Sequence, residues 1–438
     1  MAQAVATNTL ENHWMPFTAN RDFKAEPRLL VRGEGVYYWN HKGEKIIDGS
    51  SGLFCCAAGH GRKEIADAVA AQLMELDYGP HFQMGHPKSF ELASRISKLT
   101  PEDLDYVFFC NSGSEAVDTA RKIAIVYHRA RGEGQRQRFV SRERAYHGVG
   151  FGGVALSGMV KNRDTFGVGL PVVTHMRHTW LPENRFTKGQ PETGAELAED
   201  LQRAVDLFGG DTIAACFVEP VAGSTGTLVP PKGYLERLRE ICDDHGILLV
   251  FDEVICGFGR MGKNFAAQSF GVTPDIITMA KAITNGSQPM GAVALHSKIY
   301  EIVTNAAPEN AIELFHGYTF SAHPAACAAG LAMMDIYEKD KLADRAAEMS
   351  PYFLESVFAL SDLPVITDIR GYGMIAGLDV AAADKPGARG SQIQKDLFAA
   401  GMHVKFTGDA GIVAPPLVAE KEHIDEVCGI LREVLSKY

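Results

Sequence analysis

The chain has 438 residues, of which 46% are hydrophobic and 22% are charged, and it carries a formal charge of -11 at pH 7. This composition is typical of a globular protein with about two or three domains. The acidic balance and the lack of a Lys/Arg cluster argue against nucleic acid or an anionic membrane as a partner, because both bind basic surfaces.

We expect neither a secretory signal nor a membrane span. Residues 1–14 do not combine a basic segment with an apolar core, and no apolar run approaches the roughly 18 residues that a membrane span requires. The eight cysteines are scattered and form no CxxC pair, which favours buried thiols in a reducing compartment. We therefore expect a cytoplasmic protein without a membrane partner.

The first two thirds of the chain predict an α/β layer. After an irregular N-terminal arm come a hairpin at 35–43 and an amphipathic helix that begins at Arg62. Helices, one of them at 234–244, then alternate with short apolar runs typical of buried strands, at 107–110, 154–156, 213–218, 247–251 and 275–280. This alternation predicts a doubly wound α/β domain over 61–325.

The pattern changes after residue 325. Long helices at about 325–360 and 422–437 bracket strand candidates at 365–368 and 376–380. We interpret 326–438 as a smaller α+β domain, with 1–60 forming an N-terminal arm and part of that same domain.

Two of the predicted strands end in residues suited to chemistry. The run 247–251 leads into Asp252, and the run 275–280 leads into Lys281. Ligands of open α/β sheets bind beyond the carboxyl ends of the strands. An acid and an amine at this edge are the minimum that a pyridoxal phosphate (PLP) enzyme needs, although each residue alone is more simply a solvated charge.

A serine- and glycine-rich turn, Ser112-Gly113-Ser114, lies between a strand and a helix. It predicts either a phosphate site at the helix N-terminus or an ordinary N-cap, and the local pattern favours neither. Glu115 does not help the phosphate interpretation, because its carboxylate would compete for the same helix dipole.

The segment Gly257–Gly262 matches GxGxxG, which raises a dinucleotide site and hence an NAD-dependent dehydrogenase. The first glycine lies too far beyond the strand, and Gly262 does not suit the start of a long helix, so we interpret the segment as a flexible glycine loop. The histidines lack the spacing of metal ligands, and we expect no metal site.

Several motifs in one order along the chain resemble those of class III PLP-dependent aminotransferases. They are 111–116, 146–148, Glu219-Pro220, 251–254 with 257–260, Ala280-Lys281 and 316–319. The stretches 12–18 and 316–326 are most similar to the omega-amino acid:pyruvate (β-alanine:pyruvate) aminotransferases. The resemblance covers nearly the whole chain and implies PLP fold type I, with a mostly parallel central sheet in a large domain and a smaller α+β domain.

The resemblance also implies roles for individual residues. Lys281 is expected to form the Schiff base with the cofactor and to move protons, and Asp252 to face the pyridine nitrogen. The other residues expected around the cofactor are Ser112, Gly113 and Ser114 at the phosphate, Tyr146 and Val254 on the two faces of the ring, and His147 and Glu219 close by.

A further group is expected to bind substrate or to act between subunits. Thr319 matches a hydroxyl that reaches the phosphate from the partner subunit, which implies a homodimer or a larger assembly. Phe17, Phe54 and Lys405 are expected at the substrate. Phe54 replaces a frequent tryptophan, and Lys405 replaces an arginine that clamps the substrate carboxylate, which a lysine cannot do in the same bidentate way.

The predicted activity is a transamination from an omega-amino acid such as β-alanine, or from a primary amine, to pyruvate by ping-pong chemistry. Within the family, the alternatives are another donor, such as a taurine-like aminosulfonate or a diamine, or a decarboxylase or aminomutase reaction. Outside it, the alternatives are the NAD-dependent dehydrogenase and a catalytically inactive binding protein.

Overall fold

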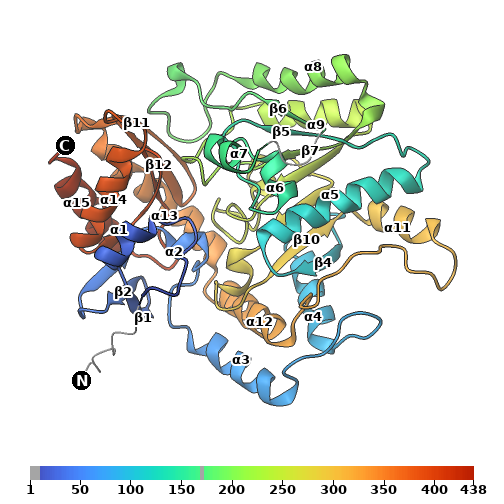
Figure 1. Ribbon diagram of the computed structural model, residues 1–438, viewed down its shortest axis with the longest axis horizontal. Coiled ribbons are helices and arrows are strands. Elements are labelled where there is room, and N and C mark those ends of the chain that lie inside the picture. Colours follow the sequence, from blue (N-terminus) through green and yellow to red (C-terminus); the bar gives the residue numbers. More distant parts are fainter. Residues whose placement is uncertain (1–9, 168–171) are drawn as a thin grey trace.

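The computed structural model describes residues 10–167 and 172–438. At its centre lies a seven-stranded sheet (Figure 1), in which β10 runs antiparallel to both neighbours and every other neighbouring pair is parallel. In spatial order the strands are β4 (Tyr106–Cys110), β10 (Gly291–Leu295), β9 (Ile276–Met279), β8 (Leu248–Asp252), β7 (Ile213–Val218), β5 (Arg138–Arg142) and β6 (Val173–Met176).

The sheet is buried on both faces, and this explains its unbroken apolar strands. Along β8, Leu248 and Val250 belong to one hydrophobic cluster, whereas Leu249 and Phe251 belong to the other. Because successive side chains of a strand point to opposite faces, a run without polar residues is stable only where both faces are covered.

Helices cover the central sheet (Figure 1). The helix α5 (Gly113–Ala130) packs against five of its strands, and it directly follows β4. The other helices of this part are α3 (Lys63–Glu75), α4 (Pro87–Ser97), α6 (Phe151–Leu156), α7 (Val160–Phe166), α8 (Glu199–Phe208), α9 (Tyr234–His245), α10 (Ala266–Phe270), α11 (Ser297–Ala306) and α12 (Pro324–Lys339). Within the described ranges, every helix is too short or too polar to cross a bilayer.

The two ends of the chain build a second region, at the left of Figure 1. One four-stranded sheet has the order β1 (Leu30–Glu34), β2 (Tyr37–Asn40), β3 (Lys45–Asp48) and β13 (Met402–His403), and the other has the order β11 (Ile366–Tyr372), β12 (Ile375–Val380), β15 (Ala410–Val413) and β14 (Lys405–Thr407). The accompanying helices are α1 (Asn20–Ala25), α2 (Ser51–Phe54), α13 (Leu342–Phe358), α14 (Ala388–Ala399) and α15 (Lys421–Leu435). Since β13 pairs with β3, the C-terminal part completes a sheet that the N-terminal part begins.

The strand predicted at 154–156 is wrong, because these residues end the helix α6. A short apolar run fits a buried helix as well as a strand. Glycines at its second and third residues allow close packing: a Cβ at Gly153 would lie 2.3 Å from the carbonyl oxygen of His147, and one at Gly152 would lie 1.8 Å from Oδ1 of Asp118.

The other predicted elements are largely confirmed. The hairpin is formed by β2 and β3, and the strands that end near Asp252 and Lys281 are β8 and β9. The helical range 325–360 is divided into α12 and α13, because Lys341 takes a left-handed φ of 48° between them. Sequence patterns missed β5, β6 and the antiparallel strand β10. Residues 1–9 of the predicted N-terminal arm lie outside the described residues.

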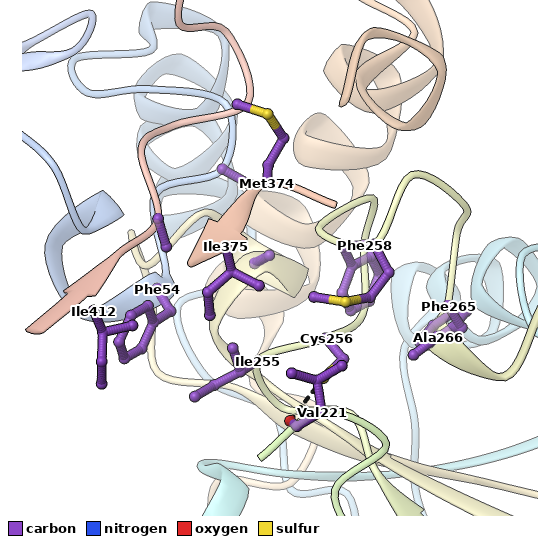
Figure 2. Packing of buried hydrophobic residues seen from close by; sticks show 14 of the residues in the cluster. Phe54, Val221, Ile255, Cys256, Phe258, Phe265, Ala266, Met374, Ile375 and Ile412 are labelled. Carbon is purple, nitrogen blue, oxygen red and sulfur yellow. Dashed lines mark hydrogen bonds between the residues drawn. The ribbon is translucent and has the colours of Figure 1, made fainter. Parts of the chain in front are cut away.

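The loop after β8 ties the central sheet to the second region. Ile255, Cys256 and Phe258 lie in one hydrophobic cluster with residues of the second region, among them Ile375 and Ile412 (Figure 2). The loop is therefore packed from both sides, and its position depends on both parts of the molecule.

A buried guanidinium completes this link. Arg260, which is 2% exposed, donates hydrogen bonds to the carbonyl oxygens of Met374 (3.0 Å) and Pro415 (2.6 Å) and to Oγ of Ser51 (3.0 Å). Burial lowers the pKa of Arg260 to about 10, against the attraction of Asp48. One side chain thus joins the loop after β8 to three segments of the second region.

We expect Arg260→Met to lower the free energy of unfolding by about 3 kcal/mol, because the two buried carbonyl oxygens would lose their donor. Denaturant unfolding followed by circular dichroism measures this change. Arg432→Met is the control, since Arg432 forms an exposed ion pair with Asp362 that contributes less than about 1 kcal/mol. Equal effects of the two substitutions would contradict the assigned role of Arg260.

Candidate active site

The loop after β4 leads directly into the N-terminus of α5, which has 18 residues. Oγ of Ser112 accepts a hydrogen bond from the backbone N–H of Glu115 (3.2 Å), and Oε2 of Glu115 accepts one from the backbone N–H of Asn111 (2.7 Å). The turn is therefore an N-cap, and the Glu115 carboxylate is directed back to Asn111. This leaves the N–H groups of Gly113 and Ser114, with the positive end of the helix dipole, to serve an anion.

The side chains near this helix end are closely fitted. Oγ of Ser114 accepts a hydrogen bond from the N–H of Val149 (3.0 Å), so its own hydroxyl proton is available to a further acceptor. A Cβ at Gly148 would lie 2.6 Å from Cα of Ser114, and one at Gly113 would lie 2.9 Å from Cγ2 of Val254. Only glycine permits these approaches.

A buried carboxylate stands at the end of β8. Asp252 is 5% exposed, and its Oδ2 lies 2.8 Å from Nδ1 of His147, which is fully enclosed. Its Oδ1 accepts a hydrogen bond from the N–H of Val254 (3.2 Å). Because a buried carboxylate needs hydrogen-bond donors, His147 and the backbone of Val254 together fix its orientation.

A second carboxylate holds the neighbouring loop. Glu219 follows β7, and its two oxygens accept hydrogen bonds from the N–H groups of Tyr146 (2.9 Å) and Gly223 (3.2 Å). Burial raises the pKa of Glu219 to about 7, and the nearby charge of Asp252 adds to this effect. Glu219 thus fixes the backbone of Tyr146 without facing solvent itself.

Lys281 lies just beyond β9 and begins a short 3-10 turn (Lys281–Thr284). Its φ of 52° is left-handed, a conformation that costs a residue other than glycine about 1–3 kcal/mol and is commonest at functional sites. Its carbonyl oxygen accepts a hydrogen bond from the N–H of Gly286 (3.1 Å), which keeps the turn closed.

These residues surround one cavity of about 110 Å³. It is lined by Gly113, Ser114, Tyr146, His147, Gly148, Glu219, Ser224, Asp252, Val254, Ile255, Ala280 and Lys281. The structure thus brings together almost all of the residues predicted around the cofactor, with Ser112 capping the helix beside them. Sequence reasoning did not single out Ser224, Ile255 and Ala280 as lining residues, although the small-residue run 222–226 was a signal for Ser224.

The predicted substrate residues lie elsewhere. Lys405 and Phe17 line a separate groove of about 330 Å³, together with Arg28 and His403. Phe54 is 5% exposed and belongs to the main hydrophobic cluster (Figure 2). Thr319 is exposed and does not border the 110 Å³ cavity of its own chain.

Comparison with known proteins assigns the fold and the chemistry. Residues 18–435 match the family model described as aminotransferase class-III. The chain belongs to this family. It is 51% identical to the omega-aminotransferase of Caulobacter vibrioides over 98% of both chains, and 47% identical to the beta-alanine–pyruvate aminotransferase of Pseudomonas aeruginosa over 98% of this chain and 96% of that protein. The omega transaminase of Pseudomonas jessenii, solved in complex with PMP, has a TM-score of 0.92 and 30% identity, covering 97% and 96% of the two chains.

Two predictions made from the sequence are thereby confirmed. The class III aminotransferase has PLP fold type I, and PLP is its cofactor. The cavity suits this group, since it combines the positive end of the α5 dipole, which favours a phosphate, with a buried carboxylate (Asp252) and a lysine amine (Lys281). Within the described ranges, no cluster of His, Cys, Asp or Glu could hold a metal ion.

The dehydrogenase alternative is wrong for this aminotransferase, and the loop that suggested it serves another purpose. The segment Gly257–Gly262 is buried, and the only helix that follows it directly, α10, has five residues. A Cβ at Gly257 would lie 3.1 Å from the ring of Phe265. The glycines of this loop therefore allow close packing rather than the approach of a dinucleotide.

We expect Gly148→Ala to raise the dissociation constant of PLP roughly tenfold or more, because the added methyl group would displace Ser114 from the start of α5, where we expect the phosphate to bind. Titration of the apoprotein, followed by fluorescence, measures this constant. Gly132→Ala is the matched control, since Gly132 has a similar φ (+79° against +93°) but nothing within 4 Å of an added Cβ. Unchanged affinity in Gly148→Ala would contradict the role of this contact.

Proposed function

We propose that this class III aminotransferase moves an amino group from an omega-amino acid, such as β-alanine, or from a primary amine to pyruvate. The observation that carries the proposal is the meeting of Lys281, Asp252 and the N-terminus of α5 at one cavity. The names of the relatives from Caulobacter vibrioides and Pseudomonas aeruginosa support the donor and acceptor classes.

Several residues of the cavity have a task in this proposal. When bound, PLP supplies an aldehyde that captures amines and a ring that accepts electrons from a substrate C–H bond. Lys281 contributes the ε-amine that anchors the aldehyde and later moves a proton between substrate and cofactor. The carboxylate of Asp252, oriented by His147, keeps the ring nitrogen protonated. Tyr146 and Val254 enclose the ring from its two faces.

The phosphate end is assigned to Gly113 and Ser114, with Ser112 as the N-cap that exposes their N–H groups. We propose residues 61–325 as the unit that carries this site and residues 1–60 with 326–438 as the smaller unit. The pairing of β3 with β13 supports the smaller unit, while α12, at the boundary between the two, packs on α3 and α4 of the larger unit. A cytoplasmic location is also proposed, because all eight cysteines lie in the described part of the chain and are free.

We propose further that the active enzyme is a homodimer in which Thr319 reaches the phosphate in the partner subunit. Thr319 lies away from the cavity of its own chain, and large apolar side chains beside it in the sequence or across its loop are exposed: Phe315 by 88%, Phe320 by 56% and Phe82 by 55%. Several large apolar side chains exposed around one loop favour burial against another protein surface.

Lys405 is proposed to hold the carboxylate of the keto acid, with Phe17 and Phe54 shaping the substrate side. Burial lowers the pKa of Lys405, and within the described residues no acid lies within ion-pairing distance of its amine. A partly buried cation without an acid partner is suited to binding an anionic substrate. A lysine provides a single point of charge, which makes the clamp less selective than an arginine.

The central experiment is Lys281→Ala, which should lower kcat for alanine formation from pyruvate by at least about 1000-fold, because the proton carrier is lost. The visible absorption band of the bound cofactor should change at the same time. Lys263→Ala, at an exposed residue, is the control.

The ping-pong scheme is tested on the unmodified enzyme with a panel of amines. For each amine donor, its concentration is varied at several fixed concentrations of pyruvate. The double-reciprocal plots of initial rate should give parallel lines, and intersecting lines would exclude the ping-pong scheme.

For Lys405→Ala we expect the KM for pyruvate to rise roughly 10- to 100-fold, because one charged hydrogen bond to the carboxylate is lost. Lys405→Arg should preserve a low KM. Lys395→Ala is the matched control, since Lys395 lines the same groove but is already paired with Asp22 (2.6 Å). An unchanged KM in Lys405→Ala would remove this residue from the substrate site.

A further inference from the structure

His316 is held on three sides against the helix that starts at the cofactor site. Its Nε2 lies 2.9 Å from Oγ1 of Thr119, its Nδ1 lies 3.3 Å from Nζ of Lys122, and its ring stacks on Phe108 with a centroid distance of 5.4 Å and an interplanar angle of 4°. Thr119 and Lys122 belong to α5 and Phe108 belongs to β4. The histidine therefore connects a loop to a rigid helix and strand.

The contacts also define the charge and tautomer of this ring. The ammonium group of Lys122 can only donate, so Nδ1 of His316 accepts and Nε2–H donates to Oγ1 of Thr119. Burial lowers the pKa of His316 to about 4, with a further contribution from the charge of Lys122. The ring is thus neutral at physiological pH, and these hydrogen bonds persist there.

The residues after His316 are fixed in the same manner. The ring of Tyr318 lies edge-on to that of His316, at a centroid distance of 4.9 Å, and its hydroxyl donates to the carbonyl oxygen of Glu115 in the first turn of α5 (3.3 Å). The backbone N–H of Tyr318 donates to Oγ of Ser321 (3.1 Å). From the other side, the hydroxyl of Tyr78 donates to the carbonyl oxygen of Thr319 (3.1 Å).

Thr319 is therefore fixed through its backbone and its neighbours while its own side chain remains exposed. The backbone of Gly317 also packs closely against Phe82, since a Cβ at this position would lie 2.7 Å from the ring. Such an arrangement is expected where a side chain must act at a site outside its own chain, since preorganisation reduces the entropy lost on binding.

We propose that His316 is a positioning residue for the active site of the partner subunit, acting by holding residues 316–321 so that the Thr319 hydroxyl meets the phosphate bound there. This inference rests on the proposed role of Thr319 across the subunit boundary. It adds that the loop is set by α5, the same helix that binds the phosphate of its own subunit. One helix thus serves both cofactor sites of the dimer.

The alternative is that His316 supports only its own subunit, by stabilising α5. Heterodimers separate the two possibilities. When a His316→Ala subunit is paired with a Lys281→Ala subunit, the site with an intact lysine belongs to the first subunit but receives its loop from the second. An effect across the boundary disappears in this heterodimer, whereas an effect within the subunit remains.

We expect the His316→Ala homodimer to bind PLP roughly tenfold or more weakly, because the phosphate loses an oriented hydrogen bond. In the heterodimer, purified with two different affinity tags, the intact-lysine site should regain the PLP dissociation constant of the unmodified enzyme and its kcat per site. Persisting weak binding in the heterodimer, or normal binding in the homodimer, would overturn the inference.

Thr319→Ala in the same pairing tests the underlying proposal separately. If the intact-lysine site of the Thr319→Ala heterodimer does not regain normal PLP affinity, Thr319 does not act in the partner subunit and the proposed dimeric site fails. If PLP affinity is regained in the Thr319→Ala heterodimer but not in the His316→Ala heterodimer, only the positioning role fails. His41→Ala, at an exposed histidine of the N-terminal hairpin, is the control and should bind PLP normally.

Two further measurements distinguish positioning from a general loss of structure. Thr119→Val removes only the hydroxyl that accepts from Nε2 and keeps the volume of a fully buried side chain, so it should reproduce the heterodimer pattern even if His316→Ala folds poorly. Amide hydrogen exchange of the apoproteins should be faster over residues 316–321 in His316→Ala and unchanged in Thr319→Ala. The proposal would be contradicted by unchanged amide exchange over residues 316–321 in His316→Ala. It would also be contradicted if the Thr119→Val heterodimer did not regain normal PLP affinity at its intact-lysine site.

Discussion

The proposed active site depends on the burial of one carboxylate, that of Asp252. A charged group that is 5% exposed is stable only when donors surround it, and here they are Nδ1 of His147 and the N–H of Val254. These partners come from the loops after β5 and β8, so satisfying the carboxylate brings both loops to the same point. Glu219, after β7, then fixes the backbone of Tyr146, which is the residue directly before His147. The proposed cofactor site is thus a consequence of polar groups that must be paired inside an apolar sheet.

The two ends of the active site are built differently. The proposed cofactor end is formed within the central sheet, at the carboxyl ends of strands that are covered on both faces. The proposed substrate end, with Lys405, Phe17 and Phe54, comes from the N-terminal and C-terminal parts of the chain. Arg260 joins them, because it follows the Asp252 strand and donates to Ser51 and to two carbonyl oxygens of the C-terminal part. Changes of substrate preference can therefore arise in the second region while the cofactor chemistry stays the same.

The errors made from sequence have local causes. Residues 154–156 were expected to form a strand because a short apolar run has no period of its own, whereas Gly152 and Gly153 permit the close packing that makes it a helix. The strand β10 was missed for a similar reason: Gly291–Leu295 consists mainly of small residues and runs against its neighbours. Ser224 reaches the cavity through the loop 219–228, whose path follows from pairing within the fold; the small-residue run 222–226 signals a turn but not where the turn lies.

The sequence by itself determined the class of protein, the strands that end at Asp252 and Lys281, and the helix that begins at Gly113, because these depend on apolar runs, their period and local capping. Only the tertiary structure decided that His147 orients Asp252, that Glu219 holds Tyr146 and that Lys405 and Phe17 share a groove. Those relations join residues distant in the chain, such as His147 and Asp252, and depend on which loops the sheet brings together. No local pattern of residue types encodes that information, whereas burial and the need to pair polar groups do.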